Sequence, residues 1–333
     1  MEIIPGIHQI EVPLPNSVMG PTNVYLAQGT QGWLLVDTGW DYADAREALE
    51  SQLREIGVGF GDIEQIVITH VHIDHYTLIG RVKELSGAKT AFHQKDYEIL
   101  QSMSLSKGDY AARLLRQFQT NGFPEDEITQ ITNIYNLAKS LTYPLDPPDI
   151  ALQDGDVIST GLFEFEVVWT PGHAPGAICL YEPVKRMLLA GDHVLPITTP
   201  NVNMQAPNDD NPLKSYLESL KKVSRLNVDL VLPGHEHIFA HLQERVLFLL
   251  SHHDQRLDHV FRASRGDGKT AYRIAHEVPW VIEPEGFREV AFEDLPIMDK
   301  AMAVGETLAH LEYLRFEGRL EKDLRDELIF YRA

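Results

Sequence analysis

The stretch "THVHIDH", residues 69–75, places three histidines and one aspartate directly after the apolar run "IEQIVI", residues 63–68. A short run rich in Ile and Val predicts a buried β-strand. Imidazole and carboxylate groups are costly to bury unless they are hydrogen-bonded or bind a metal ion. The stretch therefore predicts a functional group of polar side chains at the end of a buried strand.

The same arrangement recurs at the ends of four other predicted strands. Each strand runs into a short turn that carries one acidic or imidazole side chain: Asp37 in "LLVDTG", His173 in "VVWTPGH", Asp192 in "LLAGD" and His235 in "LVLPGH". Open sheets commonly carry functional groups on the loops at one edge of their strands. We therefore expect these residues to meet the 69–75 stretch at one site.

The local geometry of residues 69–75 predicts how their side chains are oriented. In extended backbone alternate side chains share one face, so His70, His72 and Asp74 would point together. A turn after the strand would bring His75 beside Asp74. Two imidazoles could then hold one metal ion, while Asp74 and His75 hold a second ion a few ångströms away.

Each of those two pairs needs further ligands. His173, Asp192 and His235 can supply them, because they follow neighbouring strands of the same predicted arrangement. Asp192 could serve both ions, because a carboxylate has two oxygens. The sequence thus predicts a metal centre built from several strand ends.

The organisation of the chain predicts two domains. Short strands alternate with amphipathic helices up to about residue 240, apart from a helical insert at about 96–150 that ends in the turn-rich "YPLDPPD". The remainder is mainly helical and closes with a β-ribbon in "GRLEKDLRDELIFYRA". We predict a catalytic domain over 1–240 and a small winged-helix-like domain over 241–333.

The composition is that of an ordinary globular protein, with 44% hydrophobic and 23% charged residues. The N-terminus lacks the pattern of a secretion signal, and no apolar run is long enough for a membrane helix. The single cysteine, Cys179, excludes an intramolecular disulfide, and its apolar surroundings in "GAICLY" predict a buried structural thiol. These features favour a cytoplasmic location.

The formal net charge is −20, which disfavours non-specific binding to nucleic acid or anionic lipid. Residues 241–333 contain 13 basic and 18 acidic residues, a net charge of −5. A winged helix of this charge is poorly suited to phosphate contacts. We expect a lid, a substrate wall or a homodimer contact there, and a small-molecule substrate rather than nucleic acid or membrane.

Five motifs, "VDTG", "HVHIDH", "PGH", "AGDH" and "PGHEH", resemble those of the metallo-β-lactamase superfamily in order, spacing and strand context. The resemblance covers roughly residues 1–240 and implies an α/β fold, the four-layer αββα sandwich. Many members have Gly-Gly where Thr77 and Leu78 stand here, which implies altered helix packing or pocket shape. Asp192 replaces the Cys of many antibiotic-degrading members, so the chain is more similar to the glyoxalase-II, lactonase and nuclease-like branches.

The resemblance also implies roles for individual residues. One ion would be held by His70, His72, His173 and Asp192. The other would be held by Asp74, His75, Asp192 and His235. Asp37 would orient a ligand histidine or a bound water, and Asp74 would also act in catalysis by managing a proton.

Five histidines and two aspartates favour two divalent ions, with zinc preferred and iron or manganese also tolerated. The implied function is a binuclear hydrolase whose metal-activated water attacks a small carboxylic ester, thioester or lactone. Two alternatives stay open: a ribonuclease-like phosphodiesterase of the same superfamily, and a non-catalytic scaffold whose tail binds a partner.

Four further histidines lie near the motifs or in the tail. His193 and His237 each neighbour a predicted ligand, where support of the site is favoured over substrate contact. The adjacent pair His252–His253 lies in a predicted helix, and we expect it at the surface because adjacent helical residues do not share a face.

Overall fold

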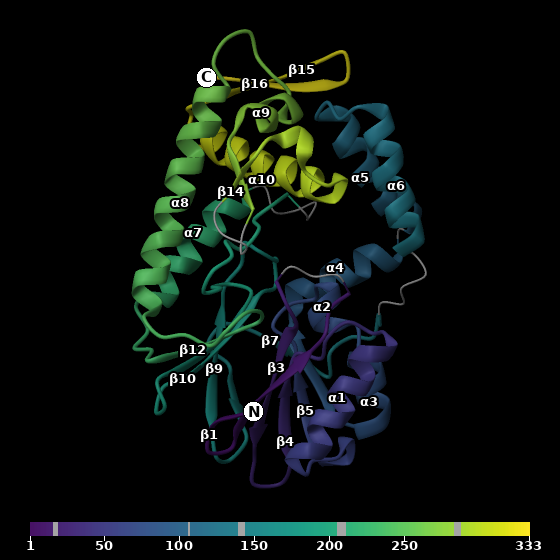
Figure 1. Ribbon diagram of the computed structural model, residues 1–333, viewed down its shortest axis with the longest axis vertical. Coiled ribbons are helices and arrows are strands. Elements are labelled where there is room, and N and C mark those ends of the chain that lie inside the picture. Colours follow the sequence, from purple (N-terminus) through teal and green to yellow (C-terminus); the bar gives the residue numbers. More distant parts are fainter. Residues whose placement is uncertain (16–18, 106, 139–143, 205–210, 283–287) are drawn as a thin grey trace. The chain divides into compact units, whose positions relative to one another are not determined.

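The computed structural model describes residues 1–15, 19–105, 107–138, 144–204, 211–282 and 288–333 (Figure 1). They form two compact units. The first comprises Met1–Gln101, Tyr143–Pro200 and Ser219–Val246, and the second comprises Ser102–Thr142, Asn201–Glu218 and Leu247–Ala333. Most of the predicted helical insert is therefore grouped with the C-terminal residues. The domain boundary at residue 240 stays a prediction.

Seven strands form the first sheet, in the order β1-β2-β3-β4-β5-β6-β7. Their bounds are Glu2–Ile4, Ile7–Val12, Thr22–Gln28, Trp33–Val36, Ile63–Val67, Lys89–His93 and Ile150–Leu152. β3 and β4 pair antiparallel as a hairpin, whereas β4, β5, β6 and β7 pair parallel. Because β4 and β5 are parallel neighbours, their carboxyl ends bring Asp37 and His70 to the same sheet edge.

Five strands form the second sheet, in the order β12-β11-β10-β9-β8. In chain order, β8 to β12 span Val157–Ser159, Glu164–Trp169, Ile178–Glu182, Met187–Gly191 and Leu230–Pro233. β11 and β12 pair parallel. Asp192 directly follows β11 and His235 lies two residues beyond β12, so the parallel pairing carries both to one edge.

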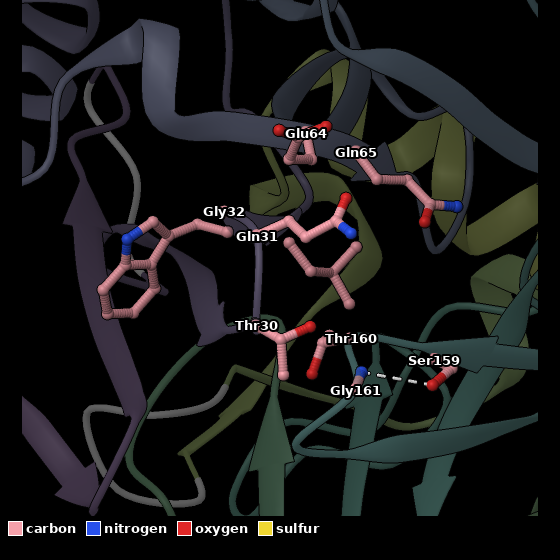
Figure 2. A pocket seen from close by; sticks show the side chains of 11 residues that line it. Thr30, Gln31, Gly32, Glu64, Gln65, Ser159, Thr160 and Gly161 are labelled. Carbon is pink, nitrogen blue, oxygen red and sulfur yellow. Dashed lines mark hydrogen bonds between the residues drawn. The ribbon is translucent and has the colours of Figure 1, made fainter.

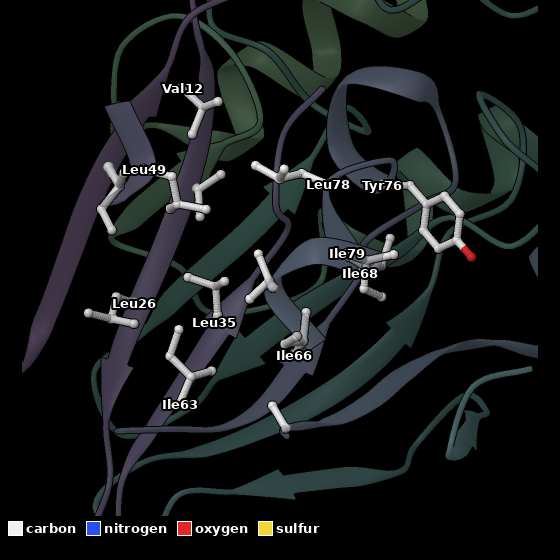
Figure 3. Close-up of a cluster of buried hydrophobic side chains, with 14 of the residues drawn as sticks. Val12, Leu26, Leu35, Leu49, Ile63, Ile66, Ile68, Tyr76, Leu78 and Ile79 are labelled. Atoms are coloured by element: carbon white, nitrogen blue, oxygen red, sulfur yellow. The ribbon is translucent and has the colours of Figure 1, made fainter. Parts of the chain in front are cut away.

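Helices cover one face of the first sheet. They are α1 (Ala43–Ile56), the single turn α2 (Ile73–Tyr76) and α3 (Ile79–Ser86), with a short 3-10 turn at Phe60–Asp62. Ala45, Leu49 and Leu53 recur at helical spacing on α1 and are buried in a cluster with strand residues such as Leu35 and Ile66 (Figure 3). Gly57 ends α1 with a φ of 85°, a left-handed backbone conformation that glycine adopts readily.

A second buried cluster joins the two sheets. It contains Val36 and Val67 from the first sheet and Val167, Leu180 and Leu189 from the second. The last residues of α7 (Pro212–Val223) lie beside the second sheet, where the Ser219 hydroxyl donates to Pro171 O (2.9 Å). This confirms the predicted αββα arrangement.

The second unit is mainly helical. Its elements include α5 (Lys107–Thr120), α6 (Glu125–Ala138), most of α8 (Leu242–Ala263), α9 (Ala271–Glu277), α10 (Ile297–Phe316) and the last residues of α4 (Gln94–Leu105). The predicted closing ribbon is present as β15 (Glu321–Arg325) and β16 (Leu328–Arg332), and a second short pair is formed by β13 (Trp280–Ile282) and β14 (Arg288–Val290). The C-terminal region is thus mostly helical, as predicted.

None of the helices within the described ranges is both long enough and apolar enough to cross a membrane.

The prediction that His252–His253 lies at the surface is wrong for His253. His253 lies on α8 and its side chain is buried against α10, where its Nδ1 lies 3.2 Å from Nε2 of the buried His310. Adjacent helical residues point about 100° apart, so the second of the two faces α10. Burial lowers the pKa of His253 well below its usual range, which keeps the ring neutral.

Candidate metal centre

The 69–75 stretch changes from strand to helix part-way along. β5 ends at Val67, His72 is extended with φ −68° and ψ 154°, and α2 begins at Ile73. The prediction that Asp74 shares a face with His70 by strand alternation is therefore wrong. A helical turn places Asp74 and His75 instead, because the His75 and Tyr76 N–H groups both donate to His72 O.

Three of the predicted ligands form a first group. His70 Nε2 lies 3.0 Å from His72 Nδ1, and His173 Nε2 lies 3.0 Å from the same atom. His70 is buried, while His72 and His173 are partly exposed. Donor atoms about 2.0–2.3 Å from one ion lie roughly 3–4 Å from one another, so this spacing could hold a metal ion.

A second group faces the first. His75 Nε2 lies 3.2 Å from His235 Nε2, and Asp74 Oδ2 lies 3.2 Å from His235 Nε2 and 3.9 Å from His75 Nε2. Both histidines are fully buried, whereas Asp74 is partly exposed. This spacing also could hold an ion.

Asp192 lies between the two groups. Its Oδ1 is 3.4 Å from His75 Nε2, and its Oδ2 is 3.5 Å from His235 Nε2, 3.7 Å from His173 Nε2 and 4.0 Å from His70 Nε2. A single carboxylate thus faces imidazoles of both groups. The structure therefore brings all seven predicted ligands together, although their binding of metal stays a prediction.

The orientation of the buried histidines fits a bound cation. His75 Nδ1 donates to Asp37 Oδ2 (2.8 Å), and His235 Nδ1 donates to Pro21 O (3.1 Å), because these oxygens can only accept. In the neutral rings the two Nε2 atoms then carry lone pairs that face each other across 3.2 Å. A positive charge between them would compensate this repulsion, as a metal ion does.

The surrounding carboxylates also favour a positive charge at this site. Burial alone would lower the pKa of His235, but Asp192 and Asp74 raise it to about 10. Burial alone would raise the pKa of Asp74, but His75 and His235 lower it to about 2. The site therefore attracts positive charge, and its imidazole and carboxylate donors suit a divalent transition metal.

Asp37 connects to one histidine of each group. Its Oδ2 accepts from His75 Nδ1 and from the Thr69 hydroxyl (2.8 Å), and that hydroxyl lies 3.1 Å from His70 Nδ1. When the Thr69 hydroxyl donates its proton to the carboxylate, the hydroxyl oxygen can accept from His70 Nδ1. The other ring nitrogen, His70 Nε2, then has its lone pair directed at the ligand group. Asp37 Oδ1 also accepts from the Thr69 N–H (2.7 Å). This geometry supports the predicted orienting role.

Further residues hold the loop of His235, and the sequence patterns missed them. Asn23 Nδ2 donates to Pro233 O (3.0 Å) and Glu236 O (2.9 Å), and the Tyr25 hydroxyl donates to Pro233 O (2.7 Å). Glu236 in turn accepts from the Ile197 N–H (2.8 Å). Only Glu236 lies within a motif, so Asn23 and Tyr25 carry no sequence signal for this role.

The remaining predicted residues lie as follows. His193 is buried beside Ser219, and burial lowers its pKa to about 3. His237 is exposed. Cys179 is fully buried, and burial raises the pKa of its thiol to about 12, which agrees with a structural thiol. Leu78, the residue directly before α3, is buried in the core cluster between the first sheet and its helices.

A pocket of about 280 Å³ lies at the amino ends of β4 and β5, the ends opposite to those that carry Asp37 and His70 (Figure 2). It is lined by the turn from Gly29 to Leu34, by Glu64 and Gln65 at the start of β5, and by the residues 159–161. None of the seven predicted ligands lines it. The pocket is therefore separate from the metal centre.

Comparison with known proteins places this site in a family. Residues 18–235 match the family model of the metallo-beta-lactamase superfamily. A probable metallo-hydrolase of Bacillus subtilis is 26% identical over 97% of either chain, and an acyl-coenzyme A thioesterase of Gallus gallus is 28% identical over 69% of this chain and 77% of its own. The crystal structure of a metallo-beta-lactamase family protein from Thermus thermophilus covers 100% of both chains with a TM-score of 0.82 and 30% identity. The chain belongs to the metallo-beta-lactamase superfamily.

Proposed function

We propose that the protein is a binuclear metal-dependent hydrolase of a small carboxylic thioester, ester or lactone. The observation that carries the proposal is the position of Asp192, whose two oxygens face both groups of ligand atoms. The Gallus gallus relative is named as a thioesterase, which supports a thioester among these substrates. Zinc is the ion that we propose, since imidazole and carboxylate donors at this spacing suit it, with iron or manganese as alternatives.

Two bound divalent ions would lower the pKa of water and polarise a carbonyl. The residues of the chain have separate tasks around that chemistry. Asp74 is the ligand carboxylate of its group that reaches solvent, with 18% of its side chain exposed, so it is placed to take a proton from an attacking water. Asp37, buried below the ligands, keeps His70 and His75 oriented for binding.

The protein should bind two divalent ions per chain, and Asp74→Ala should reduce this number. Seven donor residues exceed what one four-coordinate ion uses, and Asp74 lies with His75 and His235 in the second group. Elemental analysis of protein purified without chelator, after zinc supplementation, measures the ratio. One ion or fewer per chain in both proteins would contradict the binuclear proposal.

Turnover should appear on a panel of acyl-thioesters, esters and lactones and should be lost in His70→Ala. A matched control is His276→Ala, which removes an exposed imidazole on α9, outside the ligand loops, and should retain activity. Activity on thioesters that persists in His70→Ala would argue for a contaminant.

Measurements of RNA binding and RNA turnover, set beside the carbonyl panel, separate the alternatives. A ribonuclease-like enzyme should bind long RNA at sub-micromolar affinity with a steep salt dependence, whereas a net charge of −20 leads us to propose weak binding. Turnover of RNA but of no carbonyl substrate would overturn the proposed function. A protein that binds two ions yet turns over nothing would favour the scaffold. A small-molecule substrate and a cytoplasmic location belong to the same proposal.

A further inference from the structure

A buried carboxylate outside the ligand set lies between two of the ligand loops. Asp96 is the third residue of α4, and its side chain is only 1% exposed. Burial raises its pKa to about 7, although two backbone N–H groups oppose this rise. Burying a carboxylate is costly unless its oxygens are hydrogen-bonded, and both oxygens of Asp96 accept hydrogen bonds.

Each oxygen of Asp96 accepts from a different loop. Oδ2 accepts from the Val71 N–H (2.9 Å), and Val71 lies between His70 and His72. Oδ1 accepts from the Gly176 N–H (2.8 Å), three residues beyond His173. One side chain therefore joins the two loops that carry all three histidines of the first group, although these loops are about 100 residues apart in the sequence.

The second loop is shaped to admit this carboxylate. A Cβ built on Gly176 would lie 2.5 Å from Asp96 Cγ and 2.6 Å from its backbone nitrogen. Any larger residue would push the loop away from α4. The Trp169 indole also donates to Pro175 O (3.0 Å), so the residue before Gly176 is tied to the end of β9, the strand that leads into the His173 loop.

We propose that Asp96 is a positioning residue that sets the distance between the His70–His72 loop and the His173 loop, and so sets the metal affinity of the first ligand group. Asp96 does not touch the ligand atoms and acts through the two backbone N–H groups. Asp74 and His75 lie on α2 and His235 follows β12, so the second group depends less on this link. The inference rests on the proposed binuclear site.

The test is a zinc titration of Asp96→Asn against a competing chromophoric chelator. Asparagine keeps the volume but sets an NH₂ group against one of the two N–H donors, so one loop contact is lost. His72→Ala and Asp74→Ala assign the two binding steps to their groups. We expect Asp96→Asn to weaken the step assigned to the first group by about 10–100-fold, as removal of a supporting hydrogen bond does, and the other step by less than about threefold.

Gly176→Ala approaches the same contact from the other loop and should reproduce the selective loss. Glu182→Gln is the matched control, because Glu182 is a buried carboxylate that accepts from the backbone N–H of Lys185 away from the ligand loops. Thermal unfolding of the metal-free variants shows whether each one folds. If Asp96→Asn does not fold, Gly176→Ala alone decides the matter.

Unchanged affinity in a folded variant, or equal weakening of both steps, would overturn the proposal. The zinc titration and the thermal unfolding measurement both need no substrate. If the parent protein binds two ions but hydrolyses nothing, the proposed function fails while this inference stands. If the parent protein binds only one ion, the binuclear proposal fails, and the titration of the parent protein shows this before any variant is made.

Discussion

Replacing Asp192 with alanine is expected to weaken both zinc-binding steps by more than about 100-fold. The reason is that its two oxygens face His75, His173 and His235 from between the two groups. Loss of a residue that merely supports a ligand typically costs about 10–100-fold, and loss of a shared ligand should exceed that at both steps. Competition titration with a chelator measures each step.

Two variants accompany this experiment. Asp192→Asn keeps the volume and removes the charge, so its loss should approach that of alanine if the charge matters more than packing. His193→Ala removes the neighbouring buried imidazole, which is outside the ligand groups, and should weaken binding by about 100-fold or less. Equal losses in Asp192→Ala and His193→Ala would refute the shared role of Asp192.

The sequence located this site because strand ends and ligand residues coincide in it. A buried strand has a readable apolar pattern, and a polar residue directly after it must lie at the sheet edge. Parallel neighbours such as β4 with β5, and β11 with β12, then bring Asp37 to His70 and Asp192 to His235. The long helices are equally predictable from the sequence, since the apolar residues of α1 and α8 recur at helical spacing.

What the sequence could not predict depends on contacts between distant segments. The single turn α2 has too few residues for any periodicity, so the local geometry of Asp74 was predicted wrongly. Asp96 looks like any acidic residue in the first turn of a helix, and its contacts with Val71 and Gly176 are what distinguish it. The burial of His253 against His310 likewise required the packing of two helices that are far apart in sequence.

Asp37→Asn is expected to weaken both zinc-binding steps by about 10–100-fold and to lower the free energy of unfolding by about 2 kcal/mol. Asp37 has a φ of 62°, a conformation that asparagine also tolerates, so the backbone should not change. The carboxylate accepts from His75 directly and reaches His70 through the Thr69 hydroxyl, so one residue orients a ligand of each group. An amide cannot accept at both oxygen positions, and a buried donor left without a partner costs about 1–3 kcal/mol.

Thr69→Val separates the two connections. Valine keeps the branched shape but removes the hydroxyl between Asp37 and His70, while the bond from His75 Nδ1 to Asp37 remains. The step assigned to the first group should therefore weaken by about tenfold, and the step assigned to the second should stay within about threefold. If Thr69→Val weakened both steps equally, or if Asp37→Asn weakened only the second, then Asp37 would not act on His70 through Thr69. Selective loss in Thr69→Val with joint loss in Asp37→Asn requires that a single buried carboxylate orients both halves of the centre.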